Sequence, residues 1–586
     1  MELVELSGKF QRWWLRHTRR LTIQWNQPDS FLRYVFFLAF MGVMFFAYAL
    51  VTNLFTIPLS GDYVLQQIPF YLNGYDDWWH FFRTGEFVLW DSSTYLGANH
   101  IGSNSFYYYL NPFFLPILLF PRALVPQGMA ILMIGKMVLA SLTFRIYLKY
   151  QGVSETNSRL FSMAYGFSGW MVYYLWFNHF MEVAVVFPLV LLGIETLLKE
   201  KKIILLASSL FLIGITNYFF LVSTSFTAFF YAVFRYFQTL PRRSWQDSLK
   251  IIGLGFVGFL SGLLMSGFVF LPSVLVAVTS DRVGGAWYLD RLIATWTAED
   301  WDQLWRLLTV WQNASLTEEP YNKFYPLVSF LFPTVSNRSS TLFRTSSYDN
   351  TISSLFMYTP LTMLVVPSLL HSIKQKKVSH FIALGILLFM LFTPITYQLV
   401  HGFTIDYGRW QIFVVTIAIA YVALQFEHRS AFKVWYFDVS FAVIFGLAFY
   451  ALAVAQANEN QYFFTALEER EWVAIGTLLY MIGVYLYFRK QYMSKTLTEI
   501  MKNAIFFESI IMGALIMNIH GLVSYPNRID NGLTLIRDQR DVITSINRED
   551  DDLFRIFNLN SGESTNLGMR LGYNGVTAFH SLYNFH

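Results

Sequence analysis

The sequence contains no cysteine and few charged residues. None of its 586 residues is Cys, and only 14% are Asp, Glu, Lys or Arg, against roughly 25% in soluble domains. The missing thiols exclude disulfides, cysteine nucleophiles, zinc–thiolate sites and iron–sulfur clusters. The low charge, together with 55% hydrophobic residues, excludes a soluble globular protein.

Several sequence patterns that would indicate other classes of protein are also missing. There is no Walker A sequence, no Gly-rich dinucleotide motif and no His-Glu-x-x-His pair, so ATP-driven, nicotinamide and zinc-peptidase chemistry are not expected. The net charge is only +4, and the basic residues are spread over short loops, so we expect no nucleic-acid partner. The chain also lacks the plain two-fold hydropathy repeat of many transporters.

Apolar runs of about 20 residues, the length that crosses a bilayer, recur along the whole chain. We therefore expect an all-α polytopic membrane protein with about 13 transmembrane helices in contact with membrane lipids. The predicted spans are 34–57, 124–147, 159–177, 182–198, 203–220, 222–240, 250–279, 354–371, 379–400, 410–426, 434–456, 471–488 and 503–524.

The charge of the loops predicts the orientation of these helices. Loops such as 199–202, 371–377 and 427–433 are basic or mixed, so they should face the cytoplasm. With an odd number of spans, the C-terminal segment then lies outside the cell membrane. The predicted regions are a cytoplasmic N-terminus (1–33), the first helix (34–57), a large first extracytoplasmic loop (58–123), helices (124–279), a second large extracytoplasmic loop (280–353), helices (354–524) and an extracytoplasmic C-terminal segment (525–586).

The extracytoplasmic segments carry secondary structure of their own. In the first loop, residues 68–72 and 78–82 predict two short interfacial helices. Residues 109–121 are apolar but contain three prolines, so we expect an interfacial or re-entrant piece and not a span. Residues 525–586 read as a partial α/β segment that stops without a closing helix, and we expect the natural chain to continue beyond it.

Three carboxylates of the first loop are candidates for chemistry. Asp62 follows the first predicted helix by a few residues, at the height of a lipid headgroup, which suits a general base. Asp76 and Asp77 are weaker candidates of the same kind. The alternative is that these carboxylates are simply solvated. The same loop offers polar and aromatic groups for substrate binding, including Gln66, Asn104 and Tyr107.

Ionisable groups also lie at the ends of later helices. His179 and Glu182, at the start of a span, could serve as a second acid, as metal ligands or as acceptor contacts, or could pair with a neighbouring helix. Arg409 follows a short outward turn, where a guanidinium can hold a lipid phosphate or simply reach the interface beside a tryptophan. Arg282 is a further phosphate candidate. Lys136 is a charge inside a span whose partner the sequence does not name.

A series of short motifs resembles the bacterial YfhO family along nearly the whole chain. The motifs are Ser60-Gly-Asp62-Tyr-x-x-Gln66, Asn111-Pro-Phe, Asn217-Tyr218-Phe, Gly408-Arg409-Trp and Tyr573-Asn-Gly-Val-x-x-Phe-x-Ser-Leu-Tyr-Asn. Members of that family look like glycosyltransferases of the GT-C type, which take a sugar from a polyprenyl-phosphate carrier and attach it to an acceptor outside the cytoplasm.

The resemblance implies a function and a site. It implies a GT-C-like helix bundle and inverting transfer of a sugar to lipoteichoic or wall teichoic acid, with Asp62 as the catalytic base. Substrate contacts are then expected at Arg409, Arg282, Gln66, Asn104, Tyr107, Asn217 and Tyr218, and a second acid or metal site at Glu182, His179, Asp76 and Asp77. The implied partners are the donor lipid, the polymer acceptor, an upstream polyprenyl-phosphate glycosyltransferase and a flippase.

Two other classes of protein stay open at this point. A transporter or flippase of a lipid-linked sugar or polymer would use the membrane-embedded Lys136, Glu182 and Glu195 for translocation. A non-catalytic assembly factor would use the C-terminal segment as a binding module. The sequence leaves open the sugar, the acceptor, the oligomeric state and whether a divalent cation takes part.

Overall fold

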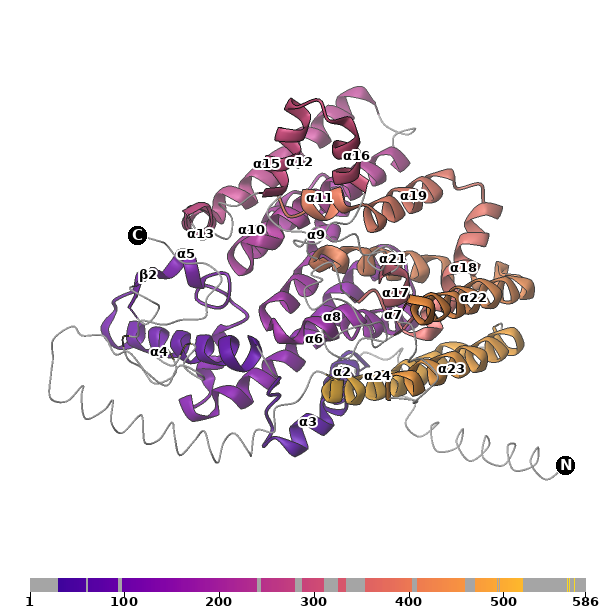
Figure 1. Cartoon of the computed structure of the whole chain (residues 1–586), viewed down its shortest axis with the longest axis horizontal. Coiled ribbons are helices and arrows are strands. Elements are labelled where there is room, and N and C mark those ends of the chain that lie inside the picture. Colours follow the sequence, from indigo (N-terminus) through magenta and orange to yellow (C-terminus); the bar gives the residue numbers. More distant parts are fainter. Residues whose placement is uncertain are drawn as a thin grey trace.

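The computed structural model describes most of the chain. The described residues are 30–59, 62–92, 97–239, 244–279, 287–309, 325–332, 354–402, 408–458, 469–492, 494 and 496–519, with Asn566, Met569 and Asn574 near the C-terminus. Within these ranges the protein is a bundle of α-helices, and its strands are one short ribbon in which β1 (Trp90–Asp91) pairs antiparallel with β2 (Ala98–Asn99) (Figure 1). The predicted all-α polytopic membrane fold is confirmed.

Each predicted apolar segment contains one or two helices. In chain order these are α2 (Ser30–Phe45), α3 (Ala47–Thr52), α6 (Val125–Tyr150), α7 (Glu155–Gly166), α8 (Gly169–Tyr173), α9 (Met181–Glu200), α10 (Ile204–Thr216), α11 (Tyr218–Thr239), α12 (Trp245–Met265), α13 (Gly267–Thr279), α18 (Thr359–Lys374), α19 (Val378–Phe392), α20 (Pro394–Leu399), α21 (Gln411–Phe426), α22 (Val434–Asn458), α23 (Glu469–Gln491) and α24 (Leu497–Ile519).

Five helices in the described ranges are long and apolar enough to cross a membrane by themselves. They are Arg122–Tyr150, Asn178–Glu200, Tyr218–Gln238, Trp245–Met265 and Gly408–Phe426. Shorter apolar helices, such as Phe31–Phe45 and Val378–Phe392, accompany them. Because a helix satisfies its backbone hydrogen bonds internally, such a bundle is compatible with lipid.

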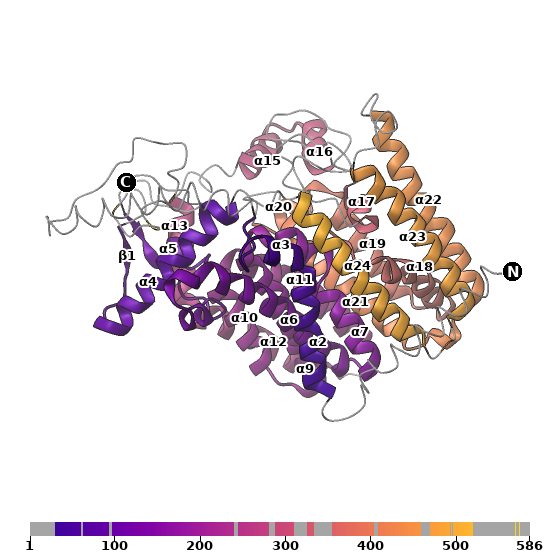
Figure 2. The ribbon, with the colours of Figure 1, turned by 90° about the horizontal axis from the view of Figure 1, so that it is seen from below.

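The helix α9 lies at the centre of one half of the bundle. Of its most apolar 18 residues, 89% are buried, and it packs against α6 and α10, while α10 packs against α12. In the other half, α18 packs against α21 and α22, and α22 packs against α23. Figure 2 shows α22, α23 and α24 along one edge of the molecule, and α2 joins the halves by packing on both α6 and α24.

The first loop contains one helix where the sequence predicted two. A single π-helical turn, η1 (Tyr63–Gln67), leads directly into α4 (Ile68–Thr84). Gly74 lies in the middle of α4, and a Cβ there would approach the Tyr108 ring to 2.3 Å, so this glycine permits close packing and does not break the helix. The first half of α4 is buried. The prediction of two short interfacial helices was therefore wrong, because no proline or capping residue divides the segment.

The remaining parts of this loop are short. The helix α5 (His100–Asn104) packs against α13, and Gly102 lets the two backbones meet, since a Cβ there would lie 2.8 Å from the Pro272 carbonyl oxygen. The proline-rich stretch forms only the 3₁₀ turns η2 (Leu115–Leu119) and η3 (Arg122–Leu124), which are too short to cross a bilayer. Figures 1 and 2 both place α4, α5 and α13 together at one end of the molecule.

The second large loop contains further helices in its described parts. These are α15 (Trp287–Thr297), α16 (Trp301–Thr309) and α17 (Tyr325–Leu331). The helices α15 and α16 contact each other, and α16 reaches α20. The α/β segment predicted for 525–586 lies outside the described residues, except for three isolated positions.

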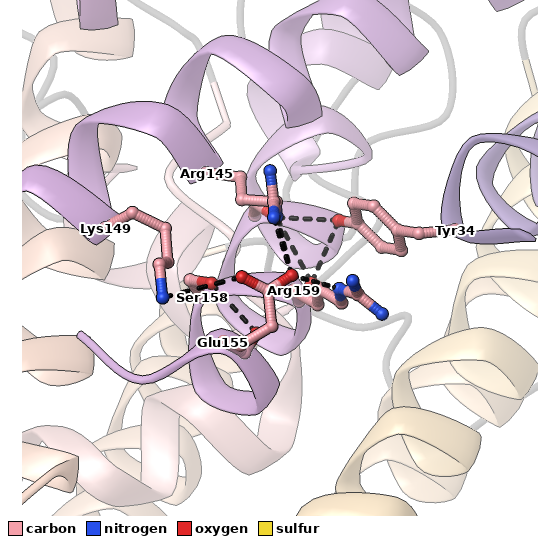
Figure 3. Close-up of polar contacts among 7 residues, drawn as sticks. Tyr34, Arg145, Lys149, Glu155, Ser158 and Arg159 are labelled. Atoms are coloured by element: carbon pink, nitrogen blue, oxygen red, sulfur yellow. Dashed lines mark hydrogen bonds and ion pairs between the residues drawn. The ribbon is translucent and has the colours of Figure 1, made fainter. Parts of the chain in front are cut away.

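A polar cluster ties three helices together at the bundle end opposite to the first loop. Glu155, which opens α7, accepts from Arg145 of α6 at 2.6 Å and from Arg159 one turn later at 2.5 Å. Tyr34 of α2 donates its hydroxyl hydrogen to the backbone carbonyl of Arg159 at 3.0 Å. Figure 3 shows these side chains converging, with Lys149 approaching the carboxylate from the other side.

Candidate functional site

Asp62 stands at the N-terminus of the π-helical turn η1, directly after the first apolar segment. Its side chain is partly exposed, whereas Gln66 and Gln67, one turn later, are buried. Since a π-helical turn takes between four and five residues, the two glutamines lie on the same face of the turn as Asp62. Isolated π-helical turns are frequent at functional sites. The carboxylate predicted as a base is therefore next to buried polar groups.

The side chain of Gln67 connects this turn to the start of α9. Its Oε1 lies 3.1 Å from Nδ1 of His179, in the 3₁₀ turn η5 (Asn178–Phe180). An amide oxygen can only accept, so Nδ1 of His179 carries the hydrogen. This tautomer leaves Nε2 as an acceptor, and that buried atom has no hydrogen-bond partner among the described residues.

Aromatic rings enclose His179 on several sides. The ring centres of Phe106 and Tyr107 each lie 5.0 Å from the imidazole, and that of Phe180 lies 4.5 Å away. Tyr218 extends the cluster through its contact with Phe106 at 5.6 Å. The structure thus brings together the predicted site residues Tyr107, His179 and Tyr218, which come from three separate parts of the sequence.

Arg409 also contacts this aromatic cluster. It lies in the turn η8 (Gly408–Trp410) before α21, and its guanidinium carbon is 4.8 Å from the ring centre of Phe180 and 5.5 Å from that of Phe219. Cation–π contacts of this kind are worth about 0.5–2 kcal/mol. Arg409 and His179 therefore both contact the ring of Phe180.

Arg409 is held in place through its backbone. The indole nitrogen of Trp170 donates to the backbone carbonyl of Arg409 at 2.9 Å. His401, also near Arg409, is buried, and burial together with the arginine charge lowers its pKa to about 3, although a hydrogen bond to the backbone at Tyr397 opposes this. His401 is therefore neutral at physiological pH, and positive charge here comes from Arg409.

Asn217 directly precedes Tyr218 of the aromatic cluster around His179, and it is buried. It ends α10 and accepts, through Oδ1, a hydrogen bond of 3.3 Å from the backbone N–H of Phe220. Its Nδ2 has no partner among the described residues. The predicted contact residue Asn217 is therefore a helix cap with one free amide group, next to the Tyr218 and Phe219 side chains that face the aromatic cluster.

Glu182, predicted as a second acid or metal ligand, is engaged in a buried ion pair. Its Oε1 lies 2.7 Å from Nζ of Lys136, and both side chains are at most 2% exposed. Asn111 donates to its other carboxylate oxygen. Lys136 also donates to the backbone carbonyl of Asn178 at 3.1 Å. Since the carboxylate and the ammonium neutralise each other, this group is a structural pair between α6 and α9 and is not available as a metal site.

Asp77 and Asn104 belong to a second buried cluster, within the first loop. Nε2 of His100 lies 3.0 Å from Asp77, and Asn104 donates to Asp91 at 3.1 Å and contacts His100 at 2.7 Å. Burial raises the pKa of Asp77, although its contact with His100 opposes the shift. In a chain without disulfides, this network fastens α4, the β-ribbon and α5 to one another. Asn104 thus belongs to the loop framework, and its backbone carbonyl accepts from the N–H of Tyr107, whose ring contacts His179.

Asp76, the last of the predicted acids, is paired as well. Arg122 holds it with two hydrogen bonds of 2.7 Å in a bidentate arrangement, which ties α4 to η3. Within the described residues, no group of three or more His, Asp or Glu side chains could hold a metal ion. Arg282 lies outside the described residues.

Two contacts could not have been found from the sequence. Gln67 was not singled out, because a glutamine beside Gln66 carries no distinctive pattern, yet it positions His179. Near the C-terminus, Asn566 donates to the backbone carbonyl of Leu65 at 2.9 Å, and Met569 is buried. The C-terminal segment therefore reaches the turn that Asp62 opens.

The fold and these clusters define a polytopic helical membrane protein with a polar and aromatic site under its first loop. Residues 35–296 match the family model described as bacterial membrane protein YfhO. This match agrees with the resemblance of the motifs in the same segment; Asp62 and His179 lie inside the matched range and Arg409 lies beyond it. No curated protein and no solved structure matches the chain.

Proposed function

We propose that this protein is a membrane glycosyltransferase of the GT-C type, which transfers a sugar from a polyprenyl-phosphate donor to an extracytoplasmic envelope polymer such as teichoic acid. The observation that carries the proposal is the position of Asp62. It is a partly exposed carboxylate directly after the first apolar segment, one turn from the Gln67–His179 contact. An acid at this height meets the headgroup of a lipid-borne donor.

Asp62, Arg409 and His179 supply the base, the cation and the hydrogen-bond acceptor that we assign to an inverting transfer. Asp62 accepts the proton of an acceptor hydroxyl while its oxygen forms a bond to the anomeric carbon. The bond from that carbon to the phosphate oxygen breaks, and the phosphate leaves on the polyprenyl chain with both electrons. Arg409 stabilises the charge on the leaving phosphate. Nε2 of His179 accepts a hydrogen bond from a sugar or acceptor hydroxyl.

The buried charges favour this function over a transporter. A translocation mechanism would use ionisable groups inside the membrane that change partners. In the structure, Lys136 is paired with Glu182 at 2.7 Å, and Glu195 with Arg235 at 2.5 Å. These groups are accounted for as structural pairs, whereas Asp62 lies at the loop boundary, where transfer chemistry needs it.

The test is transfer of labelled sugar by the purified protein in lipid nanodiscs. Polyprenyl-phosphate carrying radiolabelled glucose, galactose or N-acetylglucosamine is supplied with lipoteichoic or wall teichoic acid. Removing a general base lowers rates by about 10²–10⁴-fold, so Asp62→Asn should abolish measurable transfer. Asp302→Asn, the same change on an exposed position of α16, should leave it unchanged.

The outcomes separate the two classes of protein. Transfer that depends on Asp62 and not on Asp302 supports the glycosyltransferase. If folded wild-type protein transfers none of the donors but moves fluorescent polyprenyl-phosphate sugar between leaflets of a vesicle, the protein is a flippase and the proposal is wrong.

A further inference from the structure

A cavity lies between helices that carry none of the Asp62 turn. It has a volume of about 920 Å³ and is lined mainly by α11, α18, α19 and α21. No part of its lining belongs to the Asp62 turn or to His179. At one end the cavity is lined by Trp410, the neighbour of Arg409 in the turn η8.

The cavity has the length and the lining of a site for a lipid chain. Its lining extends from Trp410, directly before α21, to Gln425 near the end of that helix, which is about 22 Å at 1.5 Å per residue. One leaflet of the hydrocarbon core is roughly 15 Å thick. Most side chains between these ends are apolar, among them Phe413, Ala418 and Leu387.

Positive charge gathers at one end of the cavity. Lys199 lies in the last turn of α9, Arg235 lies near the end of α11 and Lys377 precedes α19, so all three lie at the end of the bundle opposite to Asp62. His380 and His428 join them. No Asp or Glu is among the described residues that line the cavity.

Among the described residues, Glu195 is the carboxylate that forms ion pairs with two of these cations. Glu195 accepts from Arg235 at 2.5 Å and lies 3.2 Å from Lys199. Among the described residues, no carboxylate lies within ion-pair distance of Lys377, which is partly buried in the cavity wall. The basic end therefore carries an excess of positive charge next to an apolar channel.

We propose that this cavity binds an anionic phospholipid of the bilayer. Its phosphate lies among Lys199, Arg235 and Lys377, and an acyl chain extends along α21 toward Trp410. A choline headgroup would bring a second cation to the basic end and is disfavoured. The cations that line the cavity lie at the end away from Trp410, the neighbour of Arg409. A lipid whose phosphate is held by them has its headgroup far from the proposed transfer site, so the occupant is a bilayer lipid and not the sugar carrier.

The test measures lipid retention by the full chain in detergent. Protein is exchanged into micelles that contain dioleoyl phosphatidylglycerol or dioleoyl phosphatidylcholine, and bound lipid is counted by native mass spectrometry. Each basic residue near a membrane surface contributes about fivefold to binding of an anionic lipid. Lys377→Gln should therefore weaken retention of phosphatidylglycerol about fivefold, while Lys374→Gln, an exposed lysine outside the cavity, should not.

A second pair of variants tests the channel. Ala383→Trp fills the cavity wall in α19 and should abolish retention, whereas Ile382→Trp, on the exposed side of the same helix, should leave it intact. Size-exclusion profiles verify that the variants are folded. Equal retention of the two lipids, equal effects of Lys377→Gln and Lys374→Gln, or displacement of phosphatidylglycerol by equimolar undecaprenyl phosphate would each overturn the proposal.

Discussion

Nδ1 of His179 and Oε1 of Gln67 lie 3.1 Å apart across 112 residues of sequence. The contact joins the first loop to the start of the central helix α9. It also selects the imidazole tautomer, since the amide oxygen accepts and leaves Nε2 as the free acceptor. A single glutamine thus sets the chemical character of the most enclosed histidine in the site.

Substitutions of Gln67 should separate a positioning role from a simple packing role. Gln67→Glu keeps an acceptor for Nδ1–H, whereas Gln67→Leu removes it and lets the imidazole change tautomer. We expect Gln67→Leu to lower kcat for sugar transfer and Gln67→Glu to retain most of it, with both proteins folded. Steady-state kinetics with matched thermal-unfolding curves provide the measurement. Equal losses in both variants would assign Gln67 to packing alone.

Arg409 should matter for the rate of transfer more than for folding. Its structural hydrogen bond with Trp170 uses the backbone carbonyl, which every substitution retains. Loss of a group that stabilises developing charge typically lowers kcat by about 10²–10³-fold. Arg409→Met should show such a loss, and Arg409→Lys should recover only part of it, because an ammonium cannot hold a phosphate in bidentate fashion. A drop in unfolding temperature that accounts for the lost activity would contradict this role.

The Lys136–Glu182 pair should behave as a structural unit. Removing one member of a buried pair costs about 3–5 kcal/mol, because the other charge is left uncompensated. We expect Lys136→Met to lower the unfolding temperature strongly. Lys136→Met combined with Glu182→Gln should recover most of it, since glutamine still accepts from Asn111. Differential scanning fluorimetry in one detergent tests this, and a double variant no more stable than Lys136→Met would refute it.

The stability of the protein should depend on pH through Asp77 and Glu155 with opposite signs. Burial raises the pKa of Asp77 above its ordinary value of 3.8, so the folded state binds the proton more tightly and stability falls as pH rises from 3.8 through the raised pKa. For Glu155, burial opposes the shift, but Arg145 and Arg159 lower the pKa below 4.5. Its contribution is present above 4.5 and is lost as pH falls through the lowered pKa.

Unfolding temperatures measured from pH 3 to pH 8 distinguish these contributions. The unfolding temperature of the wild type minus that of Asp77→Asn should decrease as pH rises above 3.8. The unfolding temperature of the wild type minus that of Glu155→Gln should increase as pH rises toward 4.5. Curves for the wild type and Asp77→Asn that run parallel would show that Asp77 does not titrate differently in the folded and unfolded states.

The class of fold followed from the sequence because it depends on local properties. The lengths of the apolar runs and the scarcity of charge are sufficient to predict a helical bundle in a membrane, and helices occupy each predicted segment. The position of Asp62 after the first run was also visible, since it requires only the order of residues along the chain. The division of α4 into two pieces was wrongly predicted, because only the packing of Tyr108 against Gly74 shows that this glycine belongs inside a helix.

The partners of the polar residues were decided by the tertiary structure alone. The sequence left open whether Glu182 is an acid or pairs with a neighbouring helix, and the structure pairs it with Lys136, because burial makes an uncompensated charge costly. Asp76 is paired with Arg122 although it is partly exposed. The approach of Arg409 to Phe180, and of Gln67 to His179, likewise joins segments that no local pattern relates. Charge pairing and ring packing act through space, so the same residue types stay ambiguous until the helices that carry them are packed.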